Sequence, residues 1–413
     1  MEELKQAYRW ISQQPMPPVF APHDVEEARA WLKEKNHPGS GVLVAGSGSH
    51  WFIGGLPDKV SDILWLRRWG RILDYSPGDM MVEVEAGCPL GVLSRRLEEE
   101  GQFLPFLPFH APDSTVGGTV AAALESPFSG ELGGPRESLI GVEVLHPEGI
   151  LSHAGGKVVK NVAGYDLCKL YCGSLGTLGV LTRLVFKVRP LRGGRSSGLM
   201  AFGTLSDLLS SARRLRDEAA PAALQVLSGR LRAAAPAQLS EAGWILAVRL
   251  LDAPATAAYK RRRIEAEGNL AAWLEGDEEE LFWKDWSRQQ RELLAPGNGW
   301  AALLINTRQA NLAQAAADLE SHLDASARQL SLTGSFQRAS LLAFVREDED
   351  LSGQVQALRQ RWNLNQDSLI LWKGSAEVKS RIDVWGTPSP LKVLQKRLQQ
   401  TFDQHGVLNP GRM

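Results

Sequence analysis

The sequence predicts an α+β protein with a two-lobed first domain and an α+β cap domain built on an antiparallel sheet. Two observations support this fold class. Residues 1–190 alternate short apolar strands with amphipathic helices and Gly-rich loops, whereas residues 198–395 repeat short strands separated by Ala- and Arg-rich helices. The second pattern is typical of an antiparallel sheet with helices on one face. We therefore expect a first domain at 1–190, a cap or substrate domain at 198–395, and a segment at 396–413 that returns to the first domain.

The composition excludes several classes of protein. The chain has 413 residues, 44% of them hydrophobic, and a net charge of −1, so it can form a large core and has no overall attraction to nucleic acid or to an anionic membrane. No segment approaches the roughly 18 apolar residues that a membrane span needs. The cysteines Cys88, Cys168 and Cys172 have no cluster spacing. We expect buried thiols, no metal site and a reducing, cytoplasmic setting.

The first lobe contains a helix, a strand and a Gly-Ser loop in that order. Residues 24–36 have an acidic first turn, helical apolar spacing and a basic end, which predicts a helix. The stretch GVLVAGSGSHWFIGG (41–55) then predicts a buried strand followed by a loop in which Gly46 and Gly48 permit close approaches. Successive N–H groups in such a loop can bind an anion, and the alternative is a plain turn.

Two strands and a helix follow. Val82, Val84 and Ala86 alternate with glutamates, which is typical of a half-buried strand, and a turn at Ser76–Asp79 connects it to the strand before. The next helix is expected to begin after Pro89.

The stretch PDSTVGGTVAAALESP suggests a second anion site. Asp113 or Ser114 can cap a helix, and Gly117 and Gly118 would leave the N–H groups of its first turn bare. The alternative is a tightly packed helix start. Further on, LIGVEVLHPEGILSHAG predicts a hairpin with its turn at HPEG.

After Pro190 the sequence changes in character. The stretch LRGGRSSG is expected to be a hinge, and the acidic run Glu275–Glu280 a solvated loop. The final amphipathic helix is either a surface helix or one packed on the first domain.

Five motifs together resemble the FAD-binding PCMH-type flavoproteins, also called the vanillyl-alcohol oxidase type. They are AGSGSH (45–50), PDSTVGG (112–118), KNVAGYDL (160–167), GSLGTLGV (173–180) and FDQHGVLNPGRM (402–413). Within that group the chain is similar to the 2-hydroxy-acid branch, and in particular to the FAD-binding subunits of glycolate oxidase (glycolate dehydrogenase) complexes.

The resemblance implies non-covalently bound FAD. Residues 45–50 and 113–118 would hold the pyrophosphate from two sides, and residues 138–144 would offer backbone groups to the isoalloxazine or adenine. Lys160 and Asn161 would lie near the flavin, and Asn409 would close the site. The implied cofactor-binding residues are Ala45, Gly46, Ser47, Gly48, Ser49, His50, Pro112, Asp113, Ser114, Thr115, Gly117, Gly118, Ala121, Ser138, Val142, Val144, Lys160, Asn161 and Asn409.

The catalytic residues are not evident. Relatives that oxidise lactate or 2-hydroxyglutarate alone carry a GHxGDGN-like motif, whereas the cap here has one histidine, His322, on a helix that we expect at the surface. A hydroxy acid needs a base for its hydroxyl proton and a cation for its carboxylate. The candidate bases are His110 and His153, and the candidate cations are Arg249, Arg308, Arg346, Lys373 and Arg381, of which Arg346, Lys373 and Arg381 are retained as catalytic candidates.

Three functions remain open at this point. The first is an FAD-binding subunit of a glycolate dehydrogenase complex that oxidises glycolate to glyoxylate, passes electrons to an acceptor other than a nicotinamide, and works with a second flavoprotein and an iron–sulfur subunit. Such a chain would be cytoplasmic and peripheral to the inner face of a membrane only through its partners. The second is a self-sufficient FAD-dependent dehydrogenase of another 2-hydroxy acid such as D-lactate. The third, a scaffold that has lost its flavin, is disfavoured by the intact glycines.

Overall fold

The computed structural model describes residues 2–12, 14–106, 111–157, 165–191, 193–239, 241–323, 330–362, 368–386 and 389–413. The chain divides into two compact units. The first unit comprises residues 1–126, 133–190 and 387–413, and the second comprises residues 127–132 and 191–386. The predicted α+β class with antiparallel sheets is confirmed.

The first unit begins with a small parallel sheet. Its elements are α1 (Glu2–Ile11), β1 (Val19–Phe20), α2 (Val25–Lys35), β2 (Val42–Ala45) and β3 (Asp62–Trp65), with the strands in the order β1-β3-β2. Successive side chains of β2 alternate between two clusters: Leu43 packs with Leu4 of α1, and Val42 packs with Leu32 of α2. Helix α2 forms as predicted, because the carboxylate of Asp24 accepts a hydrogen bond from the N–H of Glu27 (2.9 Å).

A five-stranded antiparallel sheet forms the rest of this unit's framework. Its strands are β4 (Ile72–Ser76), β5 (Met81–Glu85), β7 (Leu139–Leu145), β8 (Leu151–Gly155) and β9 (Val180–Lys187), in the order β4-β5-β9-β7-β8. The two predicted hairpins are confirmed, since β4 pairs with β5 and β7 with β8. The short elements around this sheet are α3 (Leu90–Glu98), β6 (Gln102–Phe103), α4 (Val116–Ala121), α6 (Pro135–Ser138), α7 (Cys168–Tyr171) and β10 (Arg189–Pro190).

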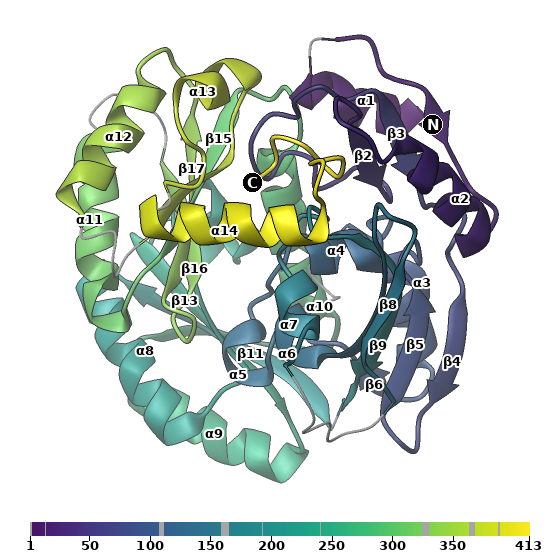
Figure 1. Cartoon of the computed structure of the whole chain (residues 1–413). Coiled ribbons are helices and arrows are strands. Elements are labelled where there is room, and N and C mark those ends of the chain that lie inside the picture. Colours follow the sequence, from purple (N-terminus) through teal and green to yellow (C-terminus); the bar gives the residue numbers. More distant parts are fainter. Residues whose placement is uncertain are drawn as a thin grey trace. The chain divides into compact units, whose positions relative to one another are not determined.

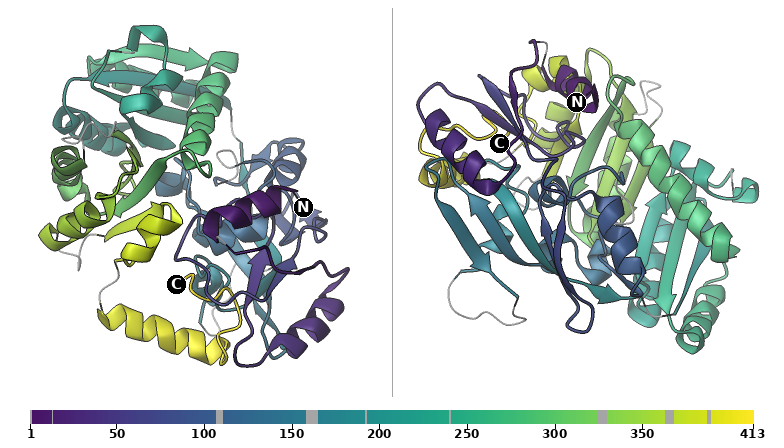
Figure 2. Two further views of the ribbon diagram at one scale, coloured as in Figure 1. Left: turned by 90° about the horizontal axis from the view of Figure 1, so that it is seen from above. Right: turned by 90° about the vertical axis from the view of Figure 1, so that its right-hand side faces the viewer.

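The final segment of the chain belongs to this first unit. Helix α14 (Ser389–Phe402) precedes it, and Phe402 packs against His146 and Tyr171. Residues 403–413, which we call the tail, then run beside β2, where the N–H of Asn409 donates to the carbonyl of Val42 (2.9 Å). Figure 1 and Figure 2 show the yellow tail next to the purple strands of the same unit.

The second unit is built on an eight-stranded antiparallel sheet (Figure 1). Its strands are β11 (Gly194–Phe202), β12 (Ala223–Leu227), β13 (Trp244–Asp252), β14 (Leu270–Glu275), β15 (Trp300–Asn306), β16 (Ser331–Ser335), β17 (Ser340–Arg346) and β18 (Ser368–Lys373), in the order β14-β11-β13-β12-β16-β17-β15-β18. Its helices are α5 (Ser129–Leu132), α8 (Leu205–Ala219), α9 (Pro254–Ala266), α10 (Gly276–Leu294), α11 (Leu312–Leu323), α12 (Leu351–Arg361) and α13 (Ala376–Arg381).

The helices of this unit cover both faces of the sheet, which corrects the expectation of one covered face. Ala301 and Leu303 of β15 belong to the same hydrophobic cluster as buried residues of α8, α9, α11 and α12. Trp300 and Ala302, which point the other way, belong to a second cluster with Leu293 of α10. The expectation of a solvated loop at residues 275–280 is also wrong. Helix α10 begins at Gly276, and the side chain of Glu279 is fully buried.

The expectation of buried thiols is confirmed. Cys88, Cys168 and Cys172 are free and buried, and burial raises the pKa of the Cys88 thiol to about 12 and that of the Cys168 thiol to about 11. Within the described ranges, no helix has both the length and the apolar character needed to cross a membrane. In the same ranges, no three metal-binding side chains gather into a group.

Candidate functional site

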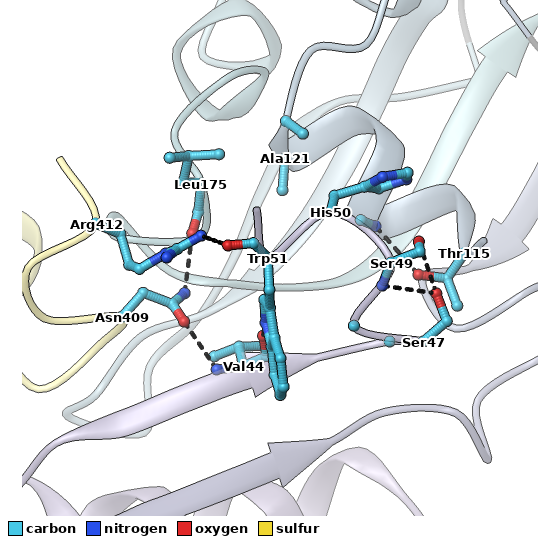
Figure 3. A pocket seen from close by; sticks show the side chains of 14 residues that line it. Val44, Ser47, Ser49, His50, Trp51, Thr115, Ala121, Leu175, Asn409 and Arg412 are labelled. Atoms are coloured by element: carbon cyan, nitrogen blue, oxygen red, sulfur yellow. Dashed lines mark hydrogen bonds between the residues drawn. The ribbon is translucent and has the colours of Figure 1, made fainter. Parts of the chain in front are cut away.

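A pocket lies in the first unit where β2 ends (Figure 3). Its walls are the loop Gly46–Trp51, α4 with its two capping residues, Leu175, and the tail. The lining residues are Val44, Gly46, Ser47, Gly48, Ser49, His50, Trp51, Thr115, Gly118, Ala121, Ala122, Leu175, Asn409 and Arg412.

The loop after β2 offers unused hydrogen-bond donors. The N–H groups of Gly46, Ser47 and Gly48 have no acceptor among the described residues. Glycine is required here for two reasons: a Cβ on residue 46 would lie 2.0 Å from Oγ1 of Thr115, and Gly48 has a φ of +78°. Consecutive free N–H groups in a glycine loop form a concave anion-binding surface. This geometry supports the predicted role of residues 46–48.

Serine hydroxyls connect this loop to the segment before α4. Oγ of Ser47 donates to Oγ of Ser49 (3.0 Å), and the hydroxyls of Ser49 and Ser114 lie 2.9 Å apart. Hydroxyl groups can both donate and accept, so reversing the direction of these two bonds would free the hydroxyl hydrogen of Ser47 for a ligand while both contacts remain. The two segments that the sequence predicted to face one another therefore meet.

The start of α4 is capped by a different residue from those expected. Thr115, rather than Asp113 or Ser114, caps the helix by accepting from the N–H of Gly118 (3.3 Å). The N–H of Gly117 donates to the carbonyl of Ala86 (2.8 Å), and a Cβ on residue 117 would lie 2.7 Å from Cβ of Ala86. These N–H groups already have acceptors, so Gly117 serves close packing, which was the alternative interpretation of this stretch.

The tail forms another wall of the pocket. Asn409 bridges two elements, since its Oδ1 accepts from the N–H of Val44 (2.8 Å) and its Nδ2 donates to the carbonyl of Leu175 (3.0 Å). Arg412 is 3% exposed and its guanidinium donates to the backbone carbonyls of Trp51, Ile53 and Gly55. Burial lowers the pKa of Arg412 to about 10, which leaves it charged at neutral pH.

The sequence reasoning selected Asn409 and missed Arg412. Both lie in the motif LNPGRM, yet only the structure shows that the Arg412 side chain turns inward. None of the fourteen lining residues is acidic. The pocket therefore combines three free N–H groups, two hydroxyls and a buried cation, which fits a phosphate-bearing group.

Several of the predicted cofactor-binding residues do not line this pocket. Ala45 ends β2 directly before the loop, and Ser114 reaches it only through Ser49. Those that lie apart from it are exposed (Pro112, Asp113), buried in α6 (Ser138), or packed in the hydrophobic core on β7 (Val142, Val144). Lys160 and Asn161 lie outside the described residues.

The three candidate catalytic cations all belong to the second unit. Two of them meet at Asn298: Nη1 of Arg346 donates to its carbonyl (3.0 Å), and Nζ of Lys373 donates to its Oδ1 (2.6 Å). Burial lowers the pKa of Lys373 to about 8. Arg381 is not part of this group, because it binds Glu377 and the carbonyl of Glu349.

Other candidate cations and bases have structural surroundings. Arg249 is buried in an ion pair with Glu279, and Arg308 precedes a short 3₁₀ turn. The ring of His153 lies on the exposed side of β8, 3.6 Å from the carboxylate of Glu143. His110 lies outside the described residues.

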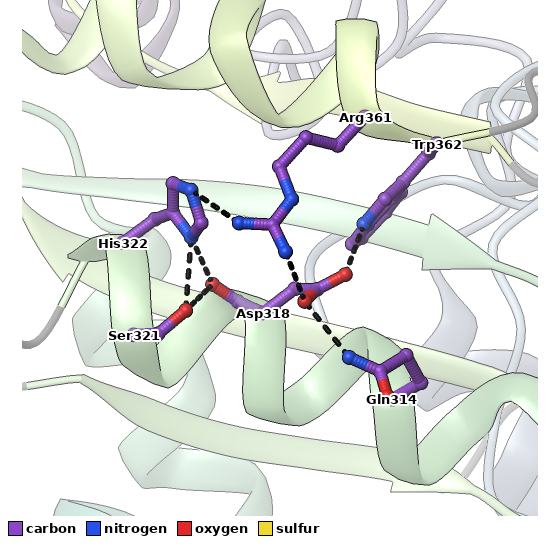
Figure 4. A network of polar contacts seen from close by, with 6 residues as sticks. All are labelled: Gln314, Asp318, Ser321, His322, Arg361 and Trp362. Carbon is purple, nitrogen blue, oxygen red and sulfur yellow. Dashed lines mark hydrogen bonds and ion pairs between the residues drawn. The ribbon is translucent and has the colours of Figure 1, made fainter.

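His322 is half-buried and belongs to a polar network that joins α11 to α12 (Figure 4). Its Nδ1 lies 2.9 Å from the carbonyl of Asp318 and 2.9 Å from Oγ of Ser321, and its Nε2 lies 3.1 Å from Nη1 of Arg361. Asp318 also accepts from the indole N–H of Trp362 (2.8 Å). Both ring nitrogens are therefore engaged in fold contacts, which fits the absence of a cap base in the sequence reasoning.

Comparison with known proteins identifies the cofactor. Residues 17–155 match the family model described as an FAD binding domain. The expected resemblance and the expected FAD cofactor are thereby confirmed, and the pocket lies in the unit that contains most of this match. The adenine and flavin of FAD are joined by a pyrophosphate, the kind of group that the pocket fits.

Curated relatives match parts of the chain. It is 37% identical over 150 residues to glycolate oxidase subunit GlcE of Escherichia coli (strain K12), a match that spans 36% of this chain and 42% of that protein. It is 31% identical over 172 residues to glycolate oxidase subunit GlcD of Bacillus subtilis (strain 168), spanning 42% and 37%. The mitochondrial D-lactate dehydrogenase (cytochrome) of Arabidopsis thaliana is 24% identical over 369 residues, spanning 81% and 62%. The matches thus span about two fifths of the two glycolate oxidase subunits.

A solved structure extends the likeness over the whole chain. Alkyldihydroxyacetonephosphate synthase superposes with a TM-score of 0.68 and 16% sequence identity, covering 95% of this chain and 76% of that one. At this identity the match shows the fold alone.

Proposed function

We propose that this chain is the FAD-binding subunit of a glycolate dehydrogenase (oxidase) complex, which oxidises glycolate to glyoxylate and passes electrons to an acceptor other than a nicotinamide. The observation that carries the proposal is the pocket of free N–H groups in a unit that matches the FAD binding domain. The 37% identity to a glycolate oxidase subunit supports the choice of substrate.

The chain's own residues would hold FAD as follows. The N–H groups of Gly46, Ser47 and Gly48 would bind the pyrophosphate, with the hydroxyl of Ser47 as a further donor. Asn409 would keep the tail wall in place through its bonds to β2 and Leu175. The bound FAD would supply the redox chemistry, since it accepts the two electrons released when the alcohol becomes a carbonyl.

The second unit supports a role that depends on partners. Its one histidine, His322, is engaged by Asp318 and Arg361, and a hydroxy acid requires a base to take its hydroxyl proton. Partner subunits, namely a second flavoprotein and an iron–sulfur protein, would then supply the base or the electron acceptor. We also propose a cytoplasmic location, with any membrane contact made through those partners.

An alternative function has its own support. A self-sufficient FAD-dependent dehydrogenase of another 2-hydroxy acid, such as D-lactate, is favoured by the match to D-lactate dehydrogenase over 81% of this chain. In that case Arg346 and Lys373, which meet at Asn298, are the candidates for binding the substrate carboxylate.

Anaerobic mixing separates these functions. The FAD-loaded chain, alone and co-purified with a flavoprotein and an iron–sulfur partner, is mixed with glycolate, D-lactate and 2-hydroxyglutarate while the visible flavin absorbance is recorded. We expect glycolate to bleach the flavin rapidly only when the partners are present. Full glycolate turnover by the isolated chain contradicts the subunit role, bleaching by D-lactate alone favours the alternative, and no bleaching in any combination contradicts both.

A further inference from the structure

We propose that Arg412 is a positioning residue for the cofactor pocket: it holds residues 46–55 in the curvature that keeps the N–H groups of Gly46, Ser47 and Gly48 available to a pyrophosphate. The inference rests on the proposed cofactor-binding role of this pocket, and it assigns to the tail a part in building the site.

The contacts of the guanidinium carry the argument. Arg412 donates to the carbonyls of Trp51, Ile53 and Gly55, which are three alternate residues directly after the anion-binding part of the loop. The Nη1–O distance to Gly55 is 2.6 Å and the Nη2–O distance to Trp51 is 2.5 Å. A planar guanidinium with five fixed donors can gather several carbonyls, and a lysine ammonium cannot reproduce that fork.

The backbone of the tail fastens the same loop in the opposite direction. The N–H of Gly55 donates to the carbonyl of Arg412 (3.1 Å), and the N–H of Asp58 donates to the carbonyl of Pro410 (3.0 Å). A Cβ on residue 55 would lie 2.2 Å from the carbonyl oxygen of Gly411. The backbones of the loop and the tail are thus in direct contact at Gly55 and Gly411. The side chain of Arg412 therefore binds a loop segment that the tail already holds closely.

The charge of Arg412 adds to this role. Its side chain lines the pocket, and no acidic residue lines it. Carbonyl oxygens carry partial negative charge, so the three that accept from the guanidinium hold it in place. Arg412 holds this loop at residues 51–55, and the loop presents free N–H groups at residues 46–48. It is therefore organised for an anion before the anion binds.

The test measures ligand binding to the flavin-free protein. Wild type, Arg412→Ala, Arg412→Lys and the control Arg397→Ala are titrated with FAD, ADP and adenosine, with folding checked by circular dichroism and thermal unfolding. Arg397 is an exposed arginine on α14 with no ion pair among the described residues, so its loss controls for the loss of a positive charge.

For Arg412→Ala we expect the Kd for FAD and the Kd for ADP to rise by roughly 10- to 100-fold, as when hydrogen bonds from a charged donor are lost. In Arg412→Lys the Kd values for FAD and ADP should rise by less. The Kd for adenosine should stay within about twofold of the wild-type value in both variants.

The outcomes are distinct from those of the proposed function. Failure of the wild-type chain to bind FAD contradicts the proposed function itself. If wild type binds FAD and Arg412→Ala binds it equally well, or loses adenosine and ADP affinity alike, the positioning role is wrong. If Arg412→Ala does not fold, Arg412→Lys decides, because wild-type affinity for FAD and ADP in that variant contradicts the proposal.

Discussion

Arg249 and Glu279 form an ion pair inside the second unit, with Nε of the arginine 2.6 Å from Oε1 of the glutamate and neither side chain more than 6% exposed. The pair joins β13 to α10. Oγ of Ser197 donates to Glu279 (3.1 Å) and itself accepts from the indole N–H of Trp283 (2.9 Å). The ring centroids of Phe128 and Trp283 lie 5.0 and 4.9 Å from Cζ of Arg249. Burial lowers the pKa of Arg249 to about 10.

Breaking this pair should destabilise the second unit strongly. Arg249→Met leaves Glu279 buried without its cation, and removing one partner of a buried pair costs about 3–5 kcal/mol. Urea unfolding followed by tryptophan fluorescence measures the loss. The control is Arg288→Met on α10, whose partners Asp285 and Glu292 are both exposed, and an exposed pair contributes about 0–1 kcal/mol. An equal loss of unfolding free energy in the two variants would show that the buried pair stabilises the unit no more than an exposed pair does.

The same pair shows where sequence patterns end. The run Glu275–Glu280 has the composition of a solvated loop, yet the buried residues of α10 include Glu279, Phe282, Trp283 and Trp286. These positions follow the 3.6-residue period, so the helix and its inner face were present in the sequence. The arginine that neutralises Glu279 is Arg249 of β13. The sequence around Glu279 contains no signal that identifies this partner.

The candidate site divides in the same way. Local signals, namely glycines that need positive φ or close approach, correctly located the loop of residues 46–50 and the hairpins around it. Whether an N–H group at the start of α4 is free depends on hydrogen bonds to other segments, such as the bond from the N–H of Gly117 to the carbonyl of Ala86. The local sequence does not reveal those bonds. Arg412 was missed because its three acceptors lie more than 350 residues earlier in the chain.

Gly46→Ala should abolish tight FAD binding. The added Cβ would lie 2.0 Å from Oγ1 of Thr115, so the loop or the cap of α4 must move, and close-packed sites lose about 1–3 kcal/mol when overpacked. Gly78→Ala is the matched control, since a Cβ there meets no atom within 4 Å. The Kd for FAD, measured by flavin fluorescence, and the urea midpoint should change only in the first variant. Unchanged FAD affinity in Gly46→Ala would exclude this loop as a cofactor wall.

Lys373 should make the second unit more stable as the pH rises. Burial lowers its pKa from 10.5 to about 8 in the folded chain, so the unfolded chain binds more protons between those values, and the free energy of unfolding increases with pH. The full difference corresponds to about 3 kcal/mol by linkage. The buried thiols act in the opposite direction, because burial raises the pKa of Cys88 and Cys172 to about 12.

Comparison with a variant isolates the contribution of Lys373. Urea unfolding of wild type and Lys373→Met is measured from pH 7.5 to pH 10, and the difference between the two free energies removes the effect of the thiols that both share. We expect wild type to gain stability relative to Lys373→Met as the pH rises through this interval. A difference that does not depend on pH would mean that Lys373 has the same pKa in the folded and unfolded chain.

The flavin should be released by acid denaturation, because we expect FAD to be held without a covalent bond. His50 lines the pocket and is the one histidine of the loop that faces the proposed pyrophosphate site, where a bond to the flavin ring is not expected. Trichloroacetic acid precipitation of the holoprotein should leave the yellow colour in the supernatant, and chromatography should identify it as FAD. His50→Ala serves as the comparison and should release its flavin in the same way. A yellow pellet from wild type and a colourless pellet from His50→Ala would instead identify His50 as the point of covalent attachment.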